Sequence, residues 1–406
     1  MQLKSISYNC YLHKKTLYLL TVAYNIKTRK KIAVIKGGNK PMKGLSVHFG
    51  RITALAGTYV ACVIGSGFAT GQEIIQFFSG HGTKSVTGTL ISGALFAWIG
   101  ATLMKHGCEH QLDTPEKVLT YYFGKRLGKV AGFFILLFLY SVFAVMIAGA
   151  GATLNEYFGL PMMAGRILIA VLSLATVVSG LEKAGDILAP IGIVIIAFTL
   201  ITGIVSILKN PQGIAKADEI ISTLSITRAK GGWFISALLY PAYNSVSVLF
   251  LACCLGAVSR NKKEAVTGGI LGGILLTLAI FTMNLGLISD IGNIFAKNVP
   301  TLVLADKISS IAGIVFSVII CCGTYTTAAP MLWGITRQFA EDRTEKSLLV
   351  ATALTAVGLI LGMTDFRVLV NVIYPYSGYA GILLMIVVAY KDVCEIIKSK
   401  KNKKRL

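Results

Sequence analysis

Long apolar segments, each bounded by charged or turn-forming residues, follow one another along most of the chain. A bilayer core accommodates a helix of about 20 apolar residues, and backbone groups in lipid must find their hydrogen bonds inside the protein. The chain is 54% hydrophobic and only 14% charged, whereas soluble domains carry roughly 25% charged residues. The sequence therefore predicts an all-α integral membrane protein. We expect about ten transmembrane helices, at residues 52–79, 86–107, 130–157, 162–180, 187–208, 232–258, 264–289, 308–336, 346–364 and 366–390.

The distribution of positive charge predicts the orientation of these helices. Most of the 39 lysines and arginines lie before residue 52, between residues 105 and 129, or after residue 390. Because cytoplasmic loops are enriched in Lys and Arg, we expect both termini in the cytoplasm and the chain in the cell (plasma) membrane. The net charge of +21 lies in loops and tails, not on one folded face, so it does not indicate a nucleic-acid partner.

The same pattern predicts the domain organisation. Residues 1–46 form a basic N-terminal arm, which is either a poorly ordered part of the protein or an extension upstream of a start at Met42. Residues 47–390 form the membrane domain, with halves at about 52–208 and 232–390, and residues 391–406 form a basic tail. Between the spans we expect a short amphipathic helix capped by Thr114, and a helical excursion at 291–307 interrupted near Pro300.

Several kinds of chemistry are not indicated. No phosphate-binding GxxxxGK[ST] motif occurs, and the spans contain neither paired carboxylates nor a histidine cluster, so we expect neither ATP-driven transport nor an enzyme. The eight cysteines include no CxxC pair. His106, Cys108 and His110 cluster at a helix end, and with no predicted partner elsewhere we interpret them as solvated polar residues, not as a metal site.

Two spans contain residues that are unfavourable inside a membrane helix. The first contains Gly65-Ser66-Gly67-Phe68-Ala69-Thr70-Gly71-Gln72-Glu73 at mid-depth. A glycine inside a helix costs roughly 1 kcal/mol relative to alanine, and a central acid costs about 2.5–3.5 kcal/mol. The sixth contains Tyr240-Pro241-Ala242-Tyr243-Asn244-Ser245, where the proline removes a backbone donor. We predict that both helices are broken there.

The two predicted breaks occupy equivalent places, because spans 1 and 6 are the first helices of two five-span halves. An odd number of spans makes the second half enter the membrane from the opposite side. Paired interruptions in inverted halves are typical of transporter binding sites near the bilayer midplane. Free amide groups at half-helix N-termini suit an anion, whereas unwound carbonyls suit an ammonium group or Na⁺.

These motifs carry a family resemblance. The segment VIGSGFATGQE of span 1, YPAYNS of span 6 and the ten-span layout resemble the amino acid/polyamine/organocation transporter superfamily, with its five-plus-five inverted LeuT fold. More narrowly, VIGSGFATGQEIIQFF resembles the bacterial YkvI-type amino acid permeases, over about residues 45–395. The resemblance implies transport of an amino acid or a similar small zwitterion.

Candidate substrate-binding residues lie at the two predicted breaks. In span 1 we expect backbone contact with the substrate carboxylate, and close helix packing is the alternative explanation of the glycines. In span 6 we expect hydroxyl, amide and carbonyl contacts, with aromatic side chains covering the substrate. The candidates are Gly65, Ser66, Gly67, Phe68, Gly71, Tyr240, Tyr243, Asn244 and Ser245. By contrast, Gly268, Gly269, Gly272 and Gly273 have the spacing of helix-packing residues.

Ion coupling has two candidates. Glu73 is the clearest acid inside a span, and it could bind a proton, a cation or the substrate ammonium, or be a carboxyl satisfied by neighbouring loose backbone. The resemblance implies a possible Na⁺ site, with hydroxyls from Thr326 and Thr327 meeting carbonyls; the alternative is threonines bonded to their own helix. The implied set is Ala61, Ile64, Gly323, Thr326 and Thr327. Span 5 lacks the lysine typical of proton-coupled members.

The sequence thus predicts a secondary transporter that works by alternating access, coupled to Na⁺ or H⁺ and without another cofactor. Its partners would be a small amino acid-like substrate and the lipid bilayer. A receptor of the same fold, which binds the amino acid without net transport, is the alternative, since fold alone does not decide function.

Overall fold

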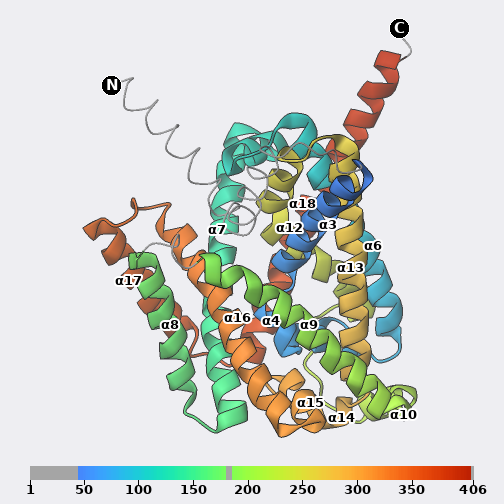
Figure 1. The fold of residues 1–406 in the computed structure, drawn as a ribbon, viewed down its shortest axis with the longest axis vertical. Helices are drawn as coiled ribbons and strands as arrows, with labels where there is room; N and C mark the ends of the chain where they lie inside the picture. Colours follow the sequence, from blue (N-terminus) through green and yellow to red (C-terminus); the bar gives the residue numbers. More distant parts are fainter. Residues whose placement is uncertain (1–43, 180–184, 404–406) are drawn as a thin grey trace.

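The computed structural model describes residues 44–179 and 185–403, and the regular structure in these ranges is helical throughout (Figure 1). The N-terminal arm expected at residues 1–46 lies outside the described residues except for its last three positions, which begin the first helix. The α-helices are α3 (Gly44–Val63), α4 (Ser66–Thr70), α5 (Gln72–Phe77), α6 (Lys84–His110), α7 (Pro115–Phe158), α8 (Met162–Ser179), α9 (Gly185–Lys209), α10 (Pro211–Ala215), α11 (Ala217–Ser222), α12 (Gly232–Ala257), α13 (Lys262–Ile288), α14 (Ile291–Ile294), α15 (Pro300–Ile308), α16 (Ser310–Thr336), α17 (Glu345–Leu361) and α18 (Phe366–Lys403), with one 3₁₀ turn at Ser79–His81.

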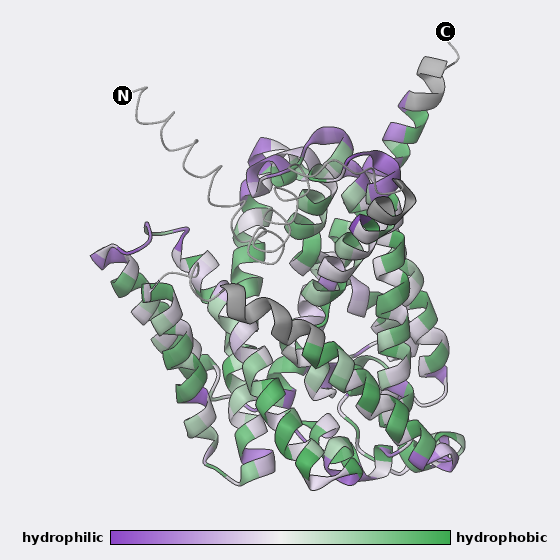
Figure 2. Cartoon of the chain, in the orientation of Figure 1, coloured by the Kyte–Doolittle hydropathy of each residue, from purple (hydrophilic) through white to green (hydrophobic). Residues whose placement is uncertain are grey.

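Each of the ten expected spans is matched by helix within the described ranges. By length and composition, six of these helices could cross a membrane alone, and the pair α17 and α18, bent by 109° at their junction, could add a seventh span. Apolar residues dominate the middle of the helices, whereas hydrophilic residues gather at their ends (Figure 2). The chain is therefore an all-α, multi-pass membrane protein.

Two expectations about the connections are confirmed. Thr114 caps α7 by accepting a hydrogen bond from the amide of Lys117, and the helix kinks at Gly124 (φ 71°), which separates a short first segment from the long apolar one. The excursion after α13 consists of α14 and α15, with Pro300 at the start of α15.

Glycines allow α6 and α13 to pack with their backbones in close contact, as their spacing predicts. A Cβ atom on Gly273 would lie 2.3 Å from the Cα atom of Ala97, and one on Gly269 would lie 2.4 Å from the amide nitrogen of Ala101. Both distances are too short for a side chain. These glycines therefore bring the two helices together, as small residues do in membrane interfaces.

The first span is broken where the sequence predicts. The helix α3 ends at Val63, Gly65 adopts an extended conformation (φ −98°, ψ −169°), and Gly71 is left-handed (φ 80°) between α4 and α5. The amide of Gly65 donates to the oxygen of Val63 and so leaves the carbonyl of Ala61 without its helical donor. A left-handed turn costs glycine little, because it has no Cβ atom.

The predicted break in the sixth span is wrong, because α12 runs without interruption from Gly232 through Pro241 to Ala257. Pro241 cannot donate to the carbonyl of Ala237, one turn earlier. Ser92 of α6 donates to that carbonyl instead, over 2.6 Å. The hydroxyl from a neighbouring helix replaces the missing backbone donor, so α12 stays continuous through Pro241.

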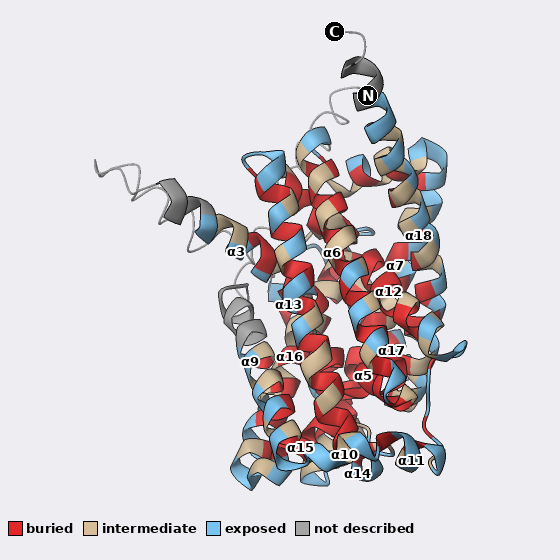
Figure 3. Ribbon diagram, turned by 90° about the vertical axis from the view of Figure 1, so that its right-hand side faces the viewer, coloured by how far each residue is buried: buried red, intermediate tan, exposed pale blue. Residues whose placement is uncertain are grey.

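The short helices of the broken span lie inside the bundle. All six residues of α5 are buried, and so are most residues in the middle of α12. Figure 3 shows this buried interior around α5, α7 and α12, with exposed residues on the outer faces of the surrounding helices. The break therefore faces protein, which is the condition for irregular backbone at membrane depth.

Candidate functional site

Glu73 lies at the centre of the candidate site. It is in the first turn of α5, and 6% of the residue is exposed. The hydroxyl of Tyr243, from α12, donates to Glu73 Oε2 over 2.7 Å. The hydroxyls of Tyr240 and Tyr374 lie near this carboxyl group, although the Tyr240 hydroxyl has no hydrogen-bond partner. Three helices that are distant in sequence, α5, α12 and α18, thus meet at one carboxyl.

Gly67 makes room for this carboxyl group. A Cβ atom at position 67 would lie 1.9 Å from Glu73 Oε1 and 3.4 Å from the hydroxyl of Tyr374. The Glu73 side chain therefore folds back over the backbone of α4, in the space that a larger residue would fill. The glycine is needed here for the close approach of the Glu73 side chain, which is neither the substrate contact nor the helix packing expected from the sequence.

Aromatic rings enclose the carboxyl group. The rings of Tyr243 and Tyr374 stack nearly parallel, with centroids 4.8 Å apart. Tyr240 meets Tyr243 edge-on at 5.5 Å, and Phe77 packs against both tyrosines of α12. The site thus combines one acid with flat apolar faces and hydroxyl groups.

Polar contacts hold α4 and α5 in place. The side-chain amide of Gln76 donates to the backbone carbonyl of Arg367, and the side-chain amide of Asn371 donates to Gln76 Oε1. These two hydrogen bonds connect α5 to α18. Thr301 of α15 donates to the carbonyl of Ala69 over 2.6 Å. Both short helices are therefore anchored by neighbours, since their five and six residues could not be stable alone.

Within the described part of the chain, the carboxyl of Glu73 has no basic side chain beside it. Among the described residues, no Lys, Arg or His forms an ion pair with it. An isolated buried carboxylate is costly, so such a group takes up a proton or a cation. The arrangement can therefore bind a proton, a metal cation or an ammonium group beside the break in span 1.

Comparison with known proteins agrees with this architecture. No known family profile matches the chain. The chain is 26% identical over 339 residues to the uncharacterized membrane protein YkvI of Bacillus subtilis, covering 82% of this chain and 94% of that protein. It is 23% identical to the uncharacterized protein YyaD of the same organism, covering 80% and 92%. The resemblance expected from the span 1 motif is thus confirmed.

Solved structures identify the fold. MhsT, crystallised with L-phenylalanine, superimposes with a TM-score of 0.55 at 14% identity, covering 82% of this chain and 87% of MhsT. The manganese transporter of Eremococcus coleocola gives a TM-score of 0.52 at 14% identity, covering 86% and 80%. The chain has the LeuT-type fold. At this identity the likeness establishes the fold of the chain and nothing about its substrate.

Within this LeuT-type fold, several expected residues do not point to a common site. Asn244 donates to the carbonyl of Tyr240, and Ser245 donates to that of Ala242, so both side chains bond to their own helix. Phe68 is buried in α4 with 1% exposed, and Gly71 packs against Thr301. The side chain of Ser66 lies outside the described part of the structure.

The residues of the expected Na⁺ site are only partly brought together. Thr326 and Thr327 both donate to the carbonyl of Gly323, over 2.8 and 3.0 Å, as the alternative explanation anticipated. However, a Cβ atom on Gly65 would lie 3.7 Å from Thr327 Oγ1, so α16 does reach the break. Ile64 is buried beside this break, whereas Ala61 is exposed.

Sequence reasoning missed Tyr374, the third tyrosine at the carboxyl group. A signal was present: Tyr374-Pro375 in α18 repeats the Tyr240-Pro241 pair of α12. Both pairs place a tyrosine before a proline inside a membrane helix. The repeat could have directed attention to α18 as the third wall of the site.

Proposed function

We propose that this protein is a secondary transporter that moves an amino acid or a similar small zwitterion by alternating access. The observation that carries the proposal is the buried carboxyl of Glu73, held at a broken helix by Tyr243 and with no basic partner among the residues that the structure describes. In a LeuT-type fold, a discontinuous first span is where a solute and its coupling ion are expected. An ionisable group at this depth is otherwise hard to explain.

Glu73 would carry the coupling step. Its carboxyl can accept a proton or a cation from one side of the membrane and must lose it before the carrier returns empty. The hydroxyl of Tyr243 would stabilise the charged form in between, since hydrogen bonds to charged groups contribute about 1.5–3 kcal/mol. Tyr374 and Gly67 would keep the carboxyl in position.

The finer parts of the proposal are the substrate class and the coupling ion. Stacked tyrosine rings beside a carboxyl suit an ammonium group attached to an apolar or aromatic body. Na⁺ would bind between the carbonyls of Ala61, Ile64 and Gly323 and the hydroxyls of Thr326 and Thr327, once those hydroxyls no longer donate to the Gly323 carbonyl. Coupling to H⁺ would need only Glu73.

We place the protein in the plasma membrane with cytoplasmic termini, because of its charge distribution.

Uptake into proteoliposomes tests this function. The purified chain would be offered a panel of labelled amino acids, with an imposed Na⁺ gradient, an imposed H⁺ gradient, or neither. A transporter accumulates at least one solute above equilibrium, and an ionophore that collapses the gradient abolishes the accumulation. Saturable binding without any uptake would instead identify a receptor of the same fold and reject the proposal.

A further inference from the structure

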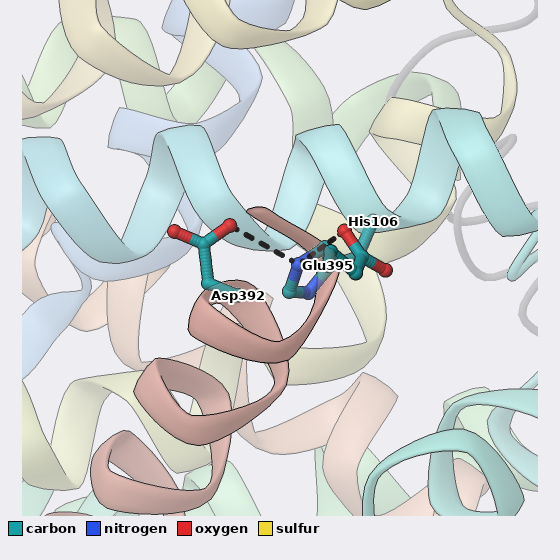
Figure 4. A group of neighbouring side chains, drawn as sticks. All are labelled: His106, Asp392 and Glu395. Atoms are coloured by element: carbon teal, nitrogen blue, oxygen red, sulfur yellow. Dashed lines mark ion pairs between the residues drawn. The ribbon is translucent and has the colours of Figure 1, made fainter. Parts of the chain in front are cut away.

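A second group of ionisable side chains lies far from Glu73, where the end of α6 meets the end of α18. The sequence interpretation of His106 and His110 as solvated polar residues without a partner is wrong. Asp392 and Glu395 of α18 lie beside them. Figure 4 shows the imidazole of His106 facing both carboxylates. The pairs are spaced by four residues on α6 and by three on α18, so each pair shares one face of its helix.

His106 is the least satisfied member of the group. Its side chain is completely buried, and its Nε2 atom has no hydrogen-bond partner. Two carboxylate oxygens nevertheless lie near this atom, Asp392 Oδ1 at 3.5 Å and Glu395 Oε2 at 3.3 Å. In the tautomer whose Nδ1 donates to Tyr122, the Nε2 lone pair faces these two anionic oxygens, which is repulsive unless a cation balances them, either the Lys105 ammonium or a metal ion.

The two separations from His106 Nε2 match a metal coordination shell. Zinc binds nitrogen and carboxylate oxygen at about 2.0–2.2 Å with tetrahedral geometry, which separates neighbouring ligand atoms by about 3.3–3.6 Å. The two distances from His106 Nε2 fall in this range. They are also longer than an ordinary hydrogen bond of about 2.9 Å.

The surroundings of His106 fit a ligand role as well. Its other ring nitrogen, Nδ1, lies 2.8 Å from the hydroxyl of Tyr122. A hydrogen bond at the second nitrogen is what orients most metal-binding histidines. Tyr121 donates to Glu395 Oε1 over 2.5 Å, and His110 contacts the same oxygen, so Glu395 is held with its Oε2 atom toward His106.

We infer that His106, Asp392 and Glu395 form a binding site for a divalent transition metal, best matched by Zn²⁺, with His110 beside it. Imidazole and carboxylate together suit such ions. Lys105 is the competitor, since its ammonium pairs with Asp392 and lies 3.5 Å from Glu395 Oε2. The metal would displace this ammonium, and the bound ion would bridge α6 to α18.

Metal binding to the purified full chain, prepared without a polyhistidine tag and stripped with a chelator, tests the site. We expect one equivalent of Co²⁺ to give the visible absorption of a tetrahedral nitrogen and oxygen site, and Zn²⁺ to displace it. Asp392→Asn and Glu395→Gln should each weaken Zn²⁺ binding roughly tenfold or more. Lys105→Gln should strengthen binding, because the competing ammonium is removed.

A control and a second readout keep the test decisive. Asp113→Asn changes a nearby carboxylate that pairs with Lys117 and lies outside the cluster, so Zn²⁺ binding should stay unchanged. Zn²⁺ should also raise the thermal unfolding midpoint of the wild type but not of the folded Asp392→Asn Glu395→Gln double variant. The inference is rejected if the wild type shows no saturable Co²⁺ or Zn²⁺ binding, or if the double variant binds as tightly as the wild type.

Discussion

Glu73 and Gly67 depend on each other at the scale of single residues. The carboxyl group occupies the space above Gly67, where a Cβ atom would lie 1.9 Å from Glu73 Oε1. The hydrogen bond from Tyr243 holds the carboxyl there, so it cannot simply swing aside. An exposed acid would tolerate a neighbouring methyl group, whereas this buried one does not.

A double-mutant cycle measures this dependence. Gly67→Ala should destabilise the protein by about 1–3 kcal/mol, because the methyl group overpacks the site. The same substitution in a Glu73→Ala background should cost clearly less, because the colliding carboxyl is gone. The free energy of unfolding in mixed micelles of detergent and denaturant provides the measurement. Equal costs in both backgrounds would show that the carboxyl does not lie over Gly67.

At the scale of helices, α12 is continuous because a side chain of α6 supplies the hydrogen bond that its proline cannot make. Ser92 donates to the Ala237 carbonyl that Pro241 cannot reach. Ser92→Ala should therefore cost about 1 kcal/mol, the scale of a polar contact between membrane helices. In a Pro241→Ala background, the new backbone amide can bond to Ala237, so Ser92→Ala should cost little. Unfolding titrations of the four proteins would reveal the coupling, and strictly additive effects would contradict this account of α12.

The contact of α16 with the break in span 1 leads to a prediction about sodium. If Thr327 leaves the Gly323 carbonyl to bind Na⁺, Thr327→Ala should raise the Na⁺ concentration for half-maximal uptake by roughly tenfold or more. Thr324, which bonds back to Ile320 on the same helix, provides the matched control Thr324→Ala. Uptake that is unchanged when choline replaces Na⁺ would end the sodium proposal.

At the scale of the whole molecule, the parts that could be predicted were those with local causes. Three glycines and an acid in one span are unfavourable in any helix, so the break between α3 and α5 was visible in the sequence. Pro241 suggested a second break, but the compensating Ser92 lies 145 positions before Ala237, whose carbonyl it bonds. His106 likewise finds its carboxylates only through the packing of α6 against α18.

Tyr374 belongs to the same class of long-range effects. It lies 131 positions after Tyr243, on the last helix, and only the fold stacks the two rings. The pattern of apolar segments predicted the helices themselves, because a bilayer imposes their length. It could not predict which side chains from distant helices would meet.

The most direct test of the central claim compares gradient-driven uptake by the wild type, Glu73→Gln and Glu156→Gln in proteoliposomes. Glu156 lies near the end of α7 and pairs with Lys297, so its substitution controls for the loss of a carboxylate. We expect Glu73→Gln to insert and fold but to lose at least about tenfold in initial rate, while Glu156→Gln transports normally. Uptake by Glu73→Gln that equals the wild type under both Na⁺ and H⁺ gradients would contradict a role for this carboxyl in transport.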